Sequence, residues 1–269
     1  KGLCMIPRKP VFASKYILST VKNFELCLSR EVLAESELNW VQDVLEQYFS
    51  EVEVTPSINQ ARDEFLKLKN NGLAGTIEKR VPFQHEVLDP SSIDFSTFKI
   101  LCERRHSVRW FKPQPVPRHI IDEAIAVAVT APSACNRQPF QFFVFDDPEQ
   151  ASEIGSIPMG TAGFSDNFQC ILVVVADLSA YPLERDRHII YIDSALASMQ
   201  LLLAFETQGL SSCVINWPDV ERLERQMSDR LSLEVHQRPV MLIAVGYADE
   251  KGLIPFSEKQ SAKDSVRRS

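Results

Sequence analysis

Residues 104–111, with the sequence RRHSVRWF, form a short basic and polar cluster. Its first six positions hold three arginines, one histidine and one serine. A guanidinium offers paired N–H donors to two oxygens at once, so such a cluster is suited to a doubly charged phosphate. The alternative is that the same charges form a solvated or salt-bridged face, and the cluster by itself leaves both interpretations open.

A second candidate segment, residues 131–140, has the sequence APSACNRQPF. Two prolines bracket its polar residues, and an apolar run follows directly. Because proline fixes φ, this pattern predicts a rigid loop at the edge of a strand. Cys135 could serve as a thiol nucleophile, but no sequence feature supplies a partner base.

Other nucleotide-binding and catalytic patterns are absent from the sequence. It contains no G-x-G-x-x-G, G-x-x-x-x-G-K-[ST], G-x-S-x-G or H-E-x-x-H. The five histidines are isolated, and none forms a pair at metal-ligand spacing, so no metal site is predicted. These absences favour a mononucleotide phosphate held by side chains over a dinucleotide held by a glycine-rich turn.

Charge and composition narrow the class of partner. The 269 residues carry a net charge of −7, which gives no electrostatic reason to expect nucleic acid or an anionic membrane. The most apolar runs, 171–176 and 199–205, have the length of core elements, so no membrane span is expected. Six scattered cysteines without a C-x-x-C pair favour free thiols and a cytoplasmic location.

The first 95 residues are predicted to form a helical N-terminal extension. Amphipathic spacing predicts helices at 14–29, 36–51 and 57–68. Ser36 or Asn39, and then Ser57, are the expected N-caps, and Gly72 and Gly75 are expected to end the third helix. No pattern in this part carries chemistry, so packing helices are predicted.

From residue 96 the pattern changes to alternating helices and strands. Helices are predicted at 118–129, 149–154, 188–209 and 220–231, and strands at 140–145, 170–176, 212–216 and 240–246. The continuous apolar run 170–176 predicts a strand buried on both faces. Residues 96–269 are therefore predicted to form an α+β domain with a small central antiparallel or mixed sheet.

Four segments together resemble the signatures of the FMN-dependent nitroreductase superfamily. They are RHSVR at 105–109, APSxxNxQPF at 131–140, GLxxCxxNW at 209–217 and IPFSEK at 254–259, in the order of the family. The segments YID at 191–193 and NW at 216–217 further resemble a branch associated with polysaccharide-biosynthesis gene sets. The resemblance implies an α/β sandwich that forms a homodimer, with FMN at the subunit interface.

The resemblance also implies roles for individual residues of the first and last signatures. Arg105, Ser107 and Lys259 would bind the FMN phosphate. Arg109 would place a cation near flavin N1 and O2, where the reduced flavin is anionic. His106 would line the ribityl chain or the ring edge. Lysine at 259 keeps the charge of the arginine that is frequent there but lacks its fork.

The two middle signatures would contact the flavin ring. The second subunit would contribute Pro132, Ser133, Ala134, Cys135 and Asn136, with Cys135 facing the substrate. The backbone of Val214, Ile215 and Asn216 would lie along the ring, with one N–H directed to N5. The family asparagine that contacts the pyrimidine has no counterpart near Gly160. The acidic-Tyr-Lys lid of flavin deiodinases is not apparent between positions 149 and 167.

The implied activity is that of an FMN-dependent NAD(P)H oxidoreductase of nitroreductase type. NADH or NADPH would deliver a hydride to flavin N5. The reduced flavin would then reduce a nitroaromatic, quinone or similar acceptor in a ping-pong cycle. No side chain would act as a catalytic acid or base. One alternative is a specialised flavin oxidase, dehydrogenase or accessory protein of a polysaccharide biosynthetic pathway, and another is a helical interaction module based on residues 1–95.

Overall fold

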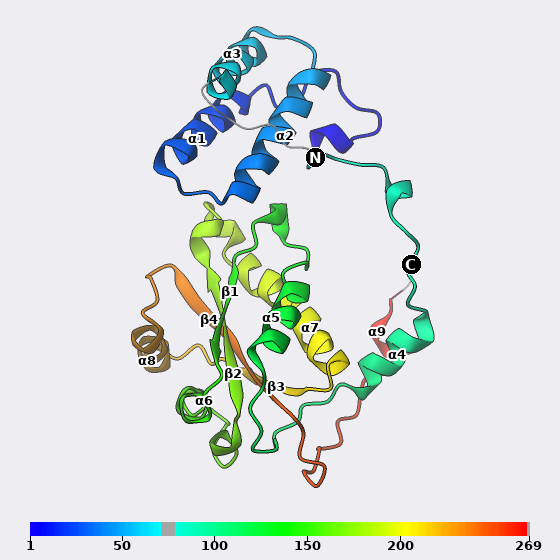
Figure 1. Cartoon of the computed structure of the whole chain (residues 1–269), viewed down its shortest axis with the longest axis vertical. Coiled ribbons are helices and arrows are strands. Elements are labelled where there is room, and N and C mark those ends of the chain that lie inside the picture. Colours follow the sequence, from blue (N-terminus) through cyan, green and yellow to red (C-terminus); the bar gives the residue numbers. More distant parts are fainter. Residues whose placement is uncertain (71–78, 268–269) are drawn as a thin grey trace. The chain divides into compact units, whose positions relative to one another are not determined.

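The computed structural model describes residues 1–70 and 79–267 (Figure 1). The chain divides into two compact units, Lys1–Ser91 and Ser92–Ser269. The helix end predicted at Gly72 and Gly75 lies outside the described residues.

The N-terminal unit contains three α-helices with a shared hydrophobic core. They are α1 (Ile17–Arg30), α2 (Glu35–Glu51) and α3 (Pro56–Asn70). Phe24, Leu45, Ile58 and Phe65 are among the buried residues between them. The three predicted helices are confirmed, because each places its apolar side chains on the face that the other helices cover.

The predicted N-caps of α2 and α3 are wrong. At the start of α2 the Glu37 carboxylate reaches back and accepts from the Ala34 N–H at 3.1 Å. At the start of α3 the Thr55 hydroxyl accepts from the Ile58 N–H at 3.3 Å. Proline is favoured at the first helical position, so Pro56 moves the cap to the residue before it and leaves Ser57 inside the first turn.

The C-terminal unit is built on one four-stranded sheet. Its strands are β1 (Phe140–Phe145), β2 (Cys170–Asp177), β3 (Ser211–Asn216) and β4 (Gln237–Gly246), in the order β1-β2-β4-β3. Every neighbouring pair is antiparallel, so the sheet is antiparallel and not mixed. All four predicted strands are confirmed, and β3 lies at an edge.

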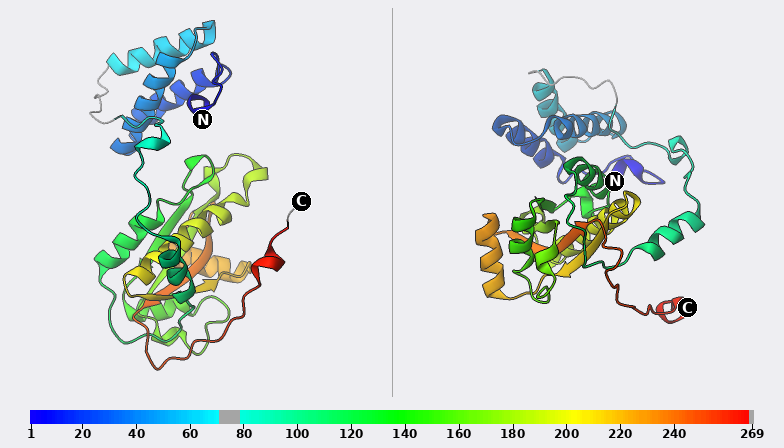
Figure 2. Two further views of the ribbon diagram at one scale, coloured as in Figure 1. Left: turned by 90° about the vertical axis from the view of Figure 1, so that its right-hand side faces the viewer. Right: turned by 60° about the horizontal axis from the view of Figure 1, so that its bottom comes forward.

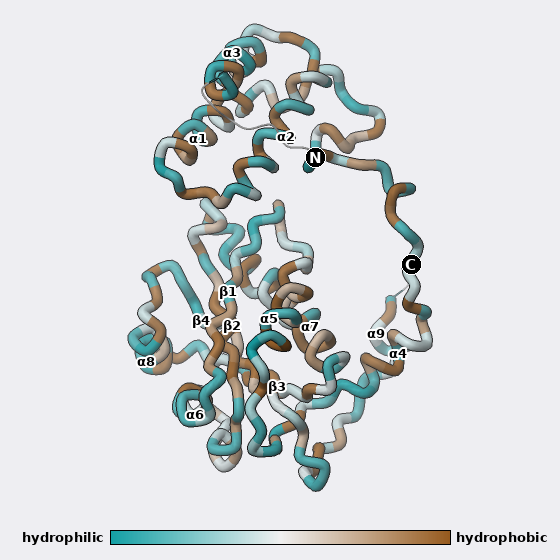
Figure 3. Tube along the Cα trace, in the orientation of Figure 1, coloured by the Kyte–Doolittle hydropathy of each residue, from teal (hydrophilic) through white to brown (hydrophobic). Residues whose placement is uncertain are grey.

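Helices cover both faces of this sheet (Figure 2). The helices of the unit are α4 (Phe95–Arg104), α5 (Arg118–Ala128), α6 (Pro148–Gly155), α7 (Ile189–Thr207), α8 (Glu221–Leu231) and α9 (Ala262–Ser265). Residues of α5 and α7 pack with Leu172 and Val174 on one face. Residues of α6 and α8 pack with Val173 and Val175 on the other. The strand β2 is therefore buried on both faces, as predicted, and hydrophobic colouring runs along it in Figure 3.

Short 3₁₀ turns complete the described part: Gly2–Cys4, His85–Val87, Ala134–Asn136, Ser165–Asn167, Leu178–Ala180 and Glu184–Asp186. The predicted α+β class with a preceding helical segment is confirmed.

No segment was expected to be long and apolar enough to span a membrane. By the criteria of length and composition alone, this expectation is wrong. Residues Glu184–Thr207, which include α7, pass that test with a mean hydropathy of 1.4. Half of the window is buried inside the fold. Ala197, Leu201 and Phe205 are fully buried, so α7 is explained as the core helix of the unit.

Candidate functional site

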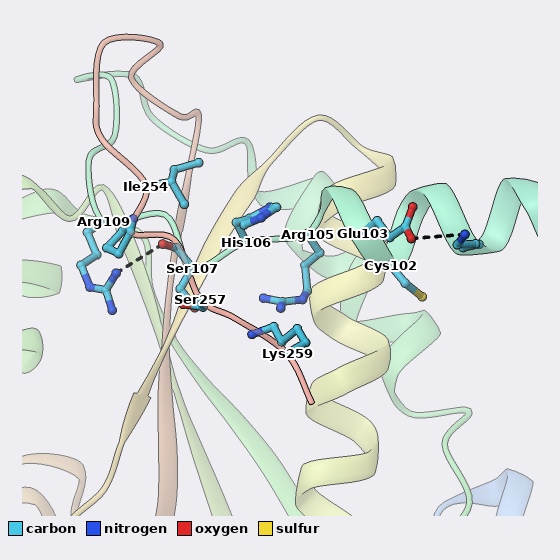
Figure 4. Close-up of a pocket in the computed structure, with 11 residues that line it drawn as sticks. Cys102, Glu103, Arg105, His106, Ser107, Arg109, Ile254, Ser257 and Lys259 are labelled. Atoms are coloured by element: carbon cyan, nitrogen blue, oxygen red, sulfur yellow. Dashed lines mark hydrogen bonds and ion pairs between the residues drawn. The ribbon is translucent and has the colours of Figure 1, made fainter. Parts of the chain in front are cut away.

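A cavity of about 410 Å³, here called the basic pocket, lies between α4, the segment that follows it and the C-terminal tail. Its lining residues are Lys99, Cys102, Glu103, Arg105, His106, Ser107, Arg109, Ile254, Pro255, Ser257 and Lys259. In Figure 4 the Arg105 and Lys259 side chains extend toward Ser107 and Ser257. The structure therefore brings the first and last predicted signatures into one pocket.

Three of the cations that line the basic pocket form no ion pair with the described residues. In the part of the chain that the structure describes, no carboxylate pairs with Arg105, Arg109 or Lys259. The one acidic side chain in the lining, Glu103, lies 3.5 Å from the Lys99 ammonium. Unpaired cations that converge on a cavity produce a positive potential, which favours a bound anion.

Arg104 does not belong to the pocket. Its Nε lies 2.8 Å from the Glu206 carboxylate on α7, and the Glu206 side chain is only 4% exposed. Neighbouring arginines of the basic cluster therefore have different roles, one in a salt bridge and the others in the pocket. The salt-bridge interpretation holds for Arg104, and Arg105 and Arg109 remain available for a ligand.

Backbone hydrogen bonds hold the cluster at the edge of the sheet. The Val108 N–H donates to the Ser212 carbonyl of β3 at 3.0 Å. Further along, the Lys112 N–H donates to the Tyr247 carbonyl at 2.8 Å, and the Asp249 N–H donates to the Trp110 carbonyl at 2.9 Å. The segment thus lies between β3 and the chain that leaves β4, which is why the tail reaches the same pocket.

Helix α4 brings Arg105 to the mouth of the pocket, because its last turn ends there. Asp94 is its N-cap, and the Asp94 carboxylate accepts from the Thr97 N–H at 2.9 Å. Hydrogen bonds from Ser96 and Thr97 lower the pKa of Asp94 to about 2. The cap is therefore ionised at neutral pH, where it also complements the helix dipole.

Arg109 is supported by the loop before β2. The Asn167 side-chain amide donates to the Arg109 carbonyl at 2.6 Å and accepts from the Phe111 N–H at 2.7 Å. The Arg109 guanidinium lies over the Phe164 ring, 5.7 Å from its centroid. Sequence reasoning missed Asn167 and Phe164. Asn167 lies just before the central strand β2, but its side-chain amide is hydrogen bonded to the backbone of Arg109 and Phe111.

The predicted β3 residues divide between the core and the surface. Ile215 is buried in the core, so it can offer a ligand only its backbone. Val214 and Asn216 have exposed side chains. Burial raises the pKa of the Cys213 thiol, and the positive charges of Arg109 and Arg105 oppose that effect. From Ser212 to Asn216 an extended strand covers about 14 Å.

The candidate residues 132–136 of the second predicted signature do not line the basic pocket of the same chain. The loop lies beside the N-terminal end of α7, where the Ala134 N–H donates to the Asp193 carboxylate at 3.2 Å. The Tyr181 hydroxyl donates to the same carboxylate. Asp193 and Tyr181 were missed as site residues. The available signal was an acid near the start of an apolar helix, because a buried carboxylate needs partners.

The chain is similar to known proteins over much of its C-terminal unit. The sequence profile described as "Nitroreductase family" matches residues 102–163 and 159–247. An NADH dehydrogenase of Thermus thermophilus is 28% identical over 186 residues, which are 57% of this chain and 88% of that protein. An iodotyrosine deiodinase of Danio rerio is 39% identical over 72 residues, 27% of this chain and 23% of that protein.

The fold is also similar to solved structures. One of them, an FMN-dependent nitroreductase of Clostridium difficile R20291, has a TM-score of 0.54 and 21% sequence identity. The similarity covers 62% of this chain and 96% of that one. The predicted nitroreductase-like fold is thereby confirmed. The family profile spans more than half of the sequence, from α4 to the end of β4, and the chain belongs to the nitroreductase family.

Proposed function

We propose that this protein is an FMN-dependent oxidoreductase that takes its electrons from NADH or NADPH. The observation that carries the proposal is the basic pocket, which Arg105, Arg109 and Lys259 line without an acidic partner among the described residues. Family membership supports it. So do the names of two relatives, an NADH dehydrogenase and an FMN-dependent nitroreductase.

The residues present fit a flavin mononucleotide. A phosphate dianion needs several charge-assisted donors, and the pocket supplies the Arg105 guanidinium, the Lys259 ammonium and the Ser107 hydroxyl. The exposed edge of β3 then leads away from Ser212 over about 14 Å, which suits an extended ribityl chain followed by a ring. At the far end, Asn216 lines a second cavity of about 770 Å³ together with Tyr191 and Trp217.

Each side chain has a role in this arrangement. Arg105, Ser107 and Lys259 hold the phosphate. Arg109 supplies the positive charge at the N1 edge of the ring, and His106 lines the ribityl chain. When bound, FMN supplies hydride transfer through N5, and Arg109 stabilises the negative charge of its reduced form. The side chains around the pocket therefore bind and orient, and none needs to exchange a proton.

We further propose that the site is completed in a homodimer. Along α7, the side chains of Tyr191, Ile192, Leu196 and Met199 are 42–49% exposed, although they are apolar and lie on one stripe of the helix. In α4, Phe95, Phe98 and Ile100 are also exposed. A second copy that covers these surfaces would bring its Ser133 to Asn136 loop to the flavin ring, with Cys135 toward the substrate.

The acceptor is proposed to be a nitroaromatic, a quinone or a similar oxidised molecule, reduced in a ping-pong cycle in the cytoplasm. A second candidate is a specialised oxidase, dehydrogenase or accessory protein of polysaccharide biosynthesis. The N-terminal unit favours it, because residues outside the family match form their own core. In either case residues 1–95 would be an extension of the flavin domain 96–269.

The decisive experiment is flavin loading of the purified full chain. We expect a yellow protein, or uptake of added FMN, and release of FMN on denaturation. NADH or NADPH should bleach the bound flavin without oxygen, and a nitroaromatic should restore its colour. A protein that takes up no FMN overturns the proposal. Bound FMN that neither nicotinamide bleaches would favour the second candidate.

A further inference from the structure

Asp193 is a buried carboxylate on α7 that contacts the loop of residues 133–138. The residue is 2% exposed. Both of its carboxylate oxygens lie 3.2 Å from the Ala134 backbone nitrogen, and one accepts a hydrogen bond from the Tyr181 hydroxyl. In the described part of the chain no basic side chain pairs with it. Its hydrogen bonds to the loop therefore have to offset its desolvation.

Tyr181 is the second member of this contact. Burial and the hydrogen bond to Asp193 raise the pKa of Tyr181, so its phenol stays neutral and donates. The Arg137 guanidinium lies 5.5 Å from the centroid of the Tyr181 ring, and it donates to the Ala180 carbonyl at 2.6 Å. The ring is thus fixed from the loop side as well.

The loop adopts a backbone that needs such support. Cys135, Asn136 and Gln138 have φ values of 56°, 54° and 47°, although none is glycine. Left-handed conformations are unfavourable for residues with a Cβ and persist where the surroundings enforce them. The Ser133 hydroxyl closes the loop by accepting from the Gln138 N–H at 3.0 Å. Three such residues in one loop are typical of a functional site.

We propose that Asp193 and Tyr181 are positioning residues that preset this loop as a shelf for the flavin ring. The inference rests on the proposed function. Both residues act through the backbone of Ala134 and do not touch the flavin themselves. A preset loop binds the ring without first being ordered, so loss of the pair weakens ring binding and leaves the phosphate pocket intact.

The test compares FMN with riboflavin, which lacks the phosphate, by fluorescence quenching on the full chain. Tyr181→Phe removes one oxygen and keeps the packing, and Asp193→Ala removes the carboxylate. We expect each substitution to weaken the binding of FMN and of riboflavin by the same factor, about tenfold, because each releases the loop that supports the ring. Arg105→Ala should weaken the binding of FMN and leave the binding of riboflavin unchanged. Asp122→Asn, an exposed acid on α5, is the control with unchanged affinities.

Turnover per bound flavin and hydrogen exchange complete the test. A merely structural role would lower the amount of folded protein and leave the dissociation constants and the turnover per flavin unchanged. Faster exchange of the Ala134 amide in Tyr181→Phe is expected, since the loop is released. If the wild-type chain binds flavin and both Tyr181→Phe and Asp193→Ala bind it with the wild-type affinity, this inference is overturned and the proposed function is not. A wild-type chain that binds no flavin overturns the proposed function first and this inference with it.

Discussion

The side-chain amide of Asn167 is hydrogen bonded to the backbone of Arg109. Its nitrogen donates to the Arg109 carbonyl at 2.6 Å and to the Phe164 carbonyl at 2.8 Å, and its oxygen accepts from the Phe111 N–H. One amide thus connects the basic cluster to the loop before β2. Because the guanidinium of Arg109 also lies over Phe164, the same loop fixes the direction of the charge.

Replacing Asn167 by alanine should therefore affect both stability and chemistry. Three hydrogen bonds are lost, so the free energy of unfolding should fall by about 2–3 kcal/mol. Reduction of bound flavin by NADH should slow, since Arg109 loses its fixed position. Thermal unfolding and anaerobic stopped-flow absorbance measure the two effects. Gln226→Ala, an exposed amide residue on α8, should change neither.

The phosphate contacts can be tested by removing their charges. Arg105→Ala and Lys259→Ala should each weaken the binding free energy of FMN by about 1.5–3 kcal/mol, because each removes a charge-assisted hydrogen bond. Isothermal titration of the apo-protein gives these affinities directly. Arg222→Ala, an exposed arginine on α8, is the control for net charge. If a variant that carries both Arg105→Ala and Lys259→Ala binds FMN with unchanged affinity, the phosphate is bound elsewhere.

The neighbours Arg104 and Arg105 should respond differently to the same substitution. Arg104→Ala leaves the buried Glu206 carboxylate without its partner, so the protein should lose about 1–2 kcal/mol of stability. Its FMN affinity should change little. Arg105→Ala should behave in the opposite way, with weaker FMN binding and nearly unchanged stability. Chemical denaturation and flavin titration of both variants show whether this division holds.

Acid should destabilise the N-terminal unit through Glu46. Burial would raise the pKa of Glu46, but hydrogen bonds from Lys79 at 2.6 Å and Lys69 at 2.9 Å outweigh it and lower the pKa to about 2. A lowered native pKa contributes stability above the ordinary value of 4.5, and that stability is lost as the pH falls from 4.5 toward 2.

Glu46→Gln should accordingly lower the stability of this unit at pH 7 by roughly 1–3 kcal/mol and flatten its acid dependence. Circular dichroism melts of the full chain between pH 2 and 7 would follow the effect. Glu53→Gln, at an exposed acid that forms no ion pair with the described residues, should retain the wild-type dependence. A Glu46→Gln curve parallel to wild type across that range would contradict the assignment.

The cysteines should differ in reactivity although all six are free thiols. Burial, with a smaller effect of Asp146, raises the pKa of Cys170 to about 12, so almost no thiolate forms there at neutral pH. Cys4 and Cys135 are exposed. Peptide mapping after brief alkylation of the native apo-protein should find label on these two and none on Cys170. Labelling of Cys170 in the folded protein would mean that β2 opens.

The sequence predicted most of the elements because their patterns are local. The apolar run of β2, the amphipathic stripe of α5 and the glycine after α7 each express a rule of backbone or burial that acts within a few residues. Caps were less predictable. At α2 and α3 several polar residues compete for the first turn, and Pro56 and Glu37 decided between them.

By itself, the sequence determined the family, the α+β class and the candidate residues from Arg105 to Lys259, because these follow from residue type and order. Only the tertiary structure decided how the charges are used. It paired Arg104 with Glu206, placed Arg105 and Lys259 in the lining of one pocket, and connected Arg109 to Asn167. It also set Asp193 beneath the 133–138 loop. Such contacts join residues far apart in the chain, and no local pattern specifies which polar group a folded backbone brings within hydrogen-bonding distance.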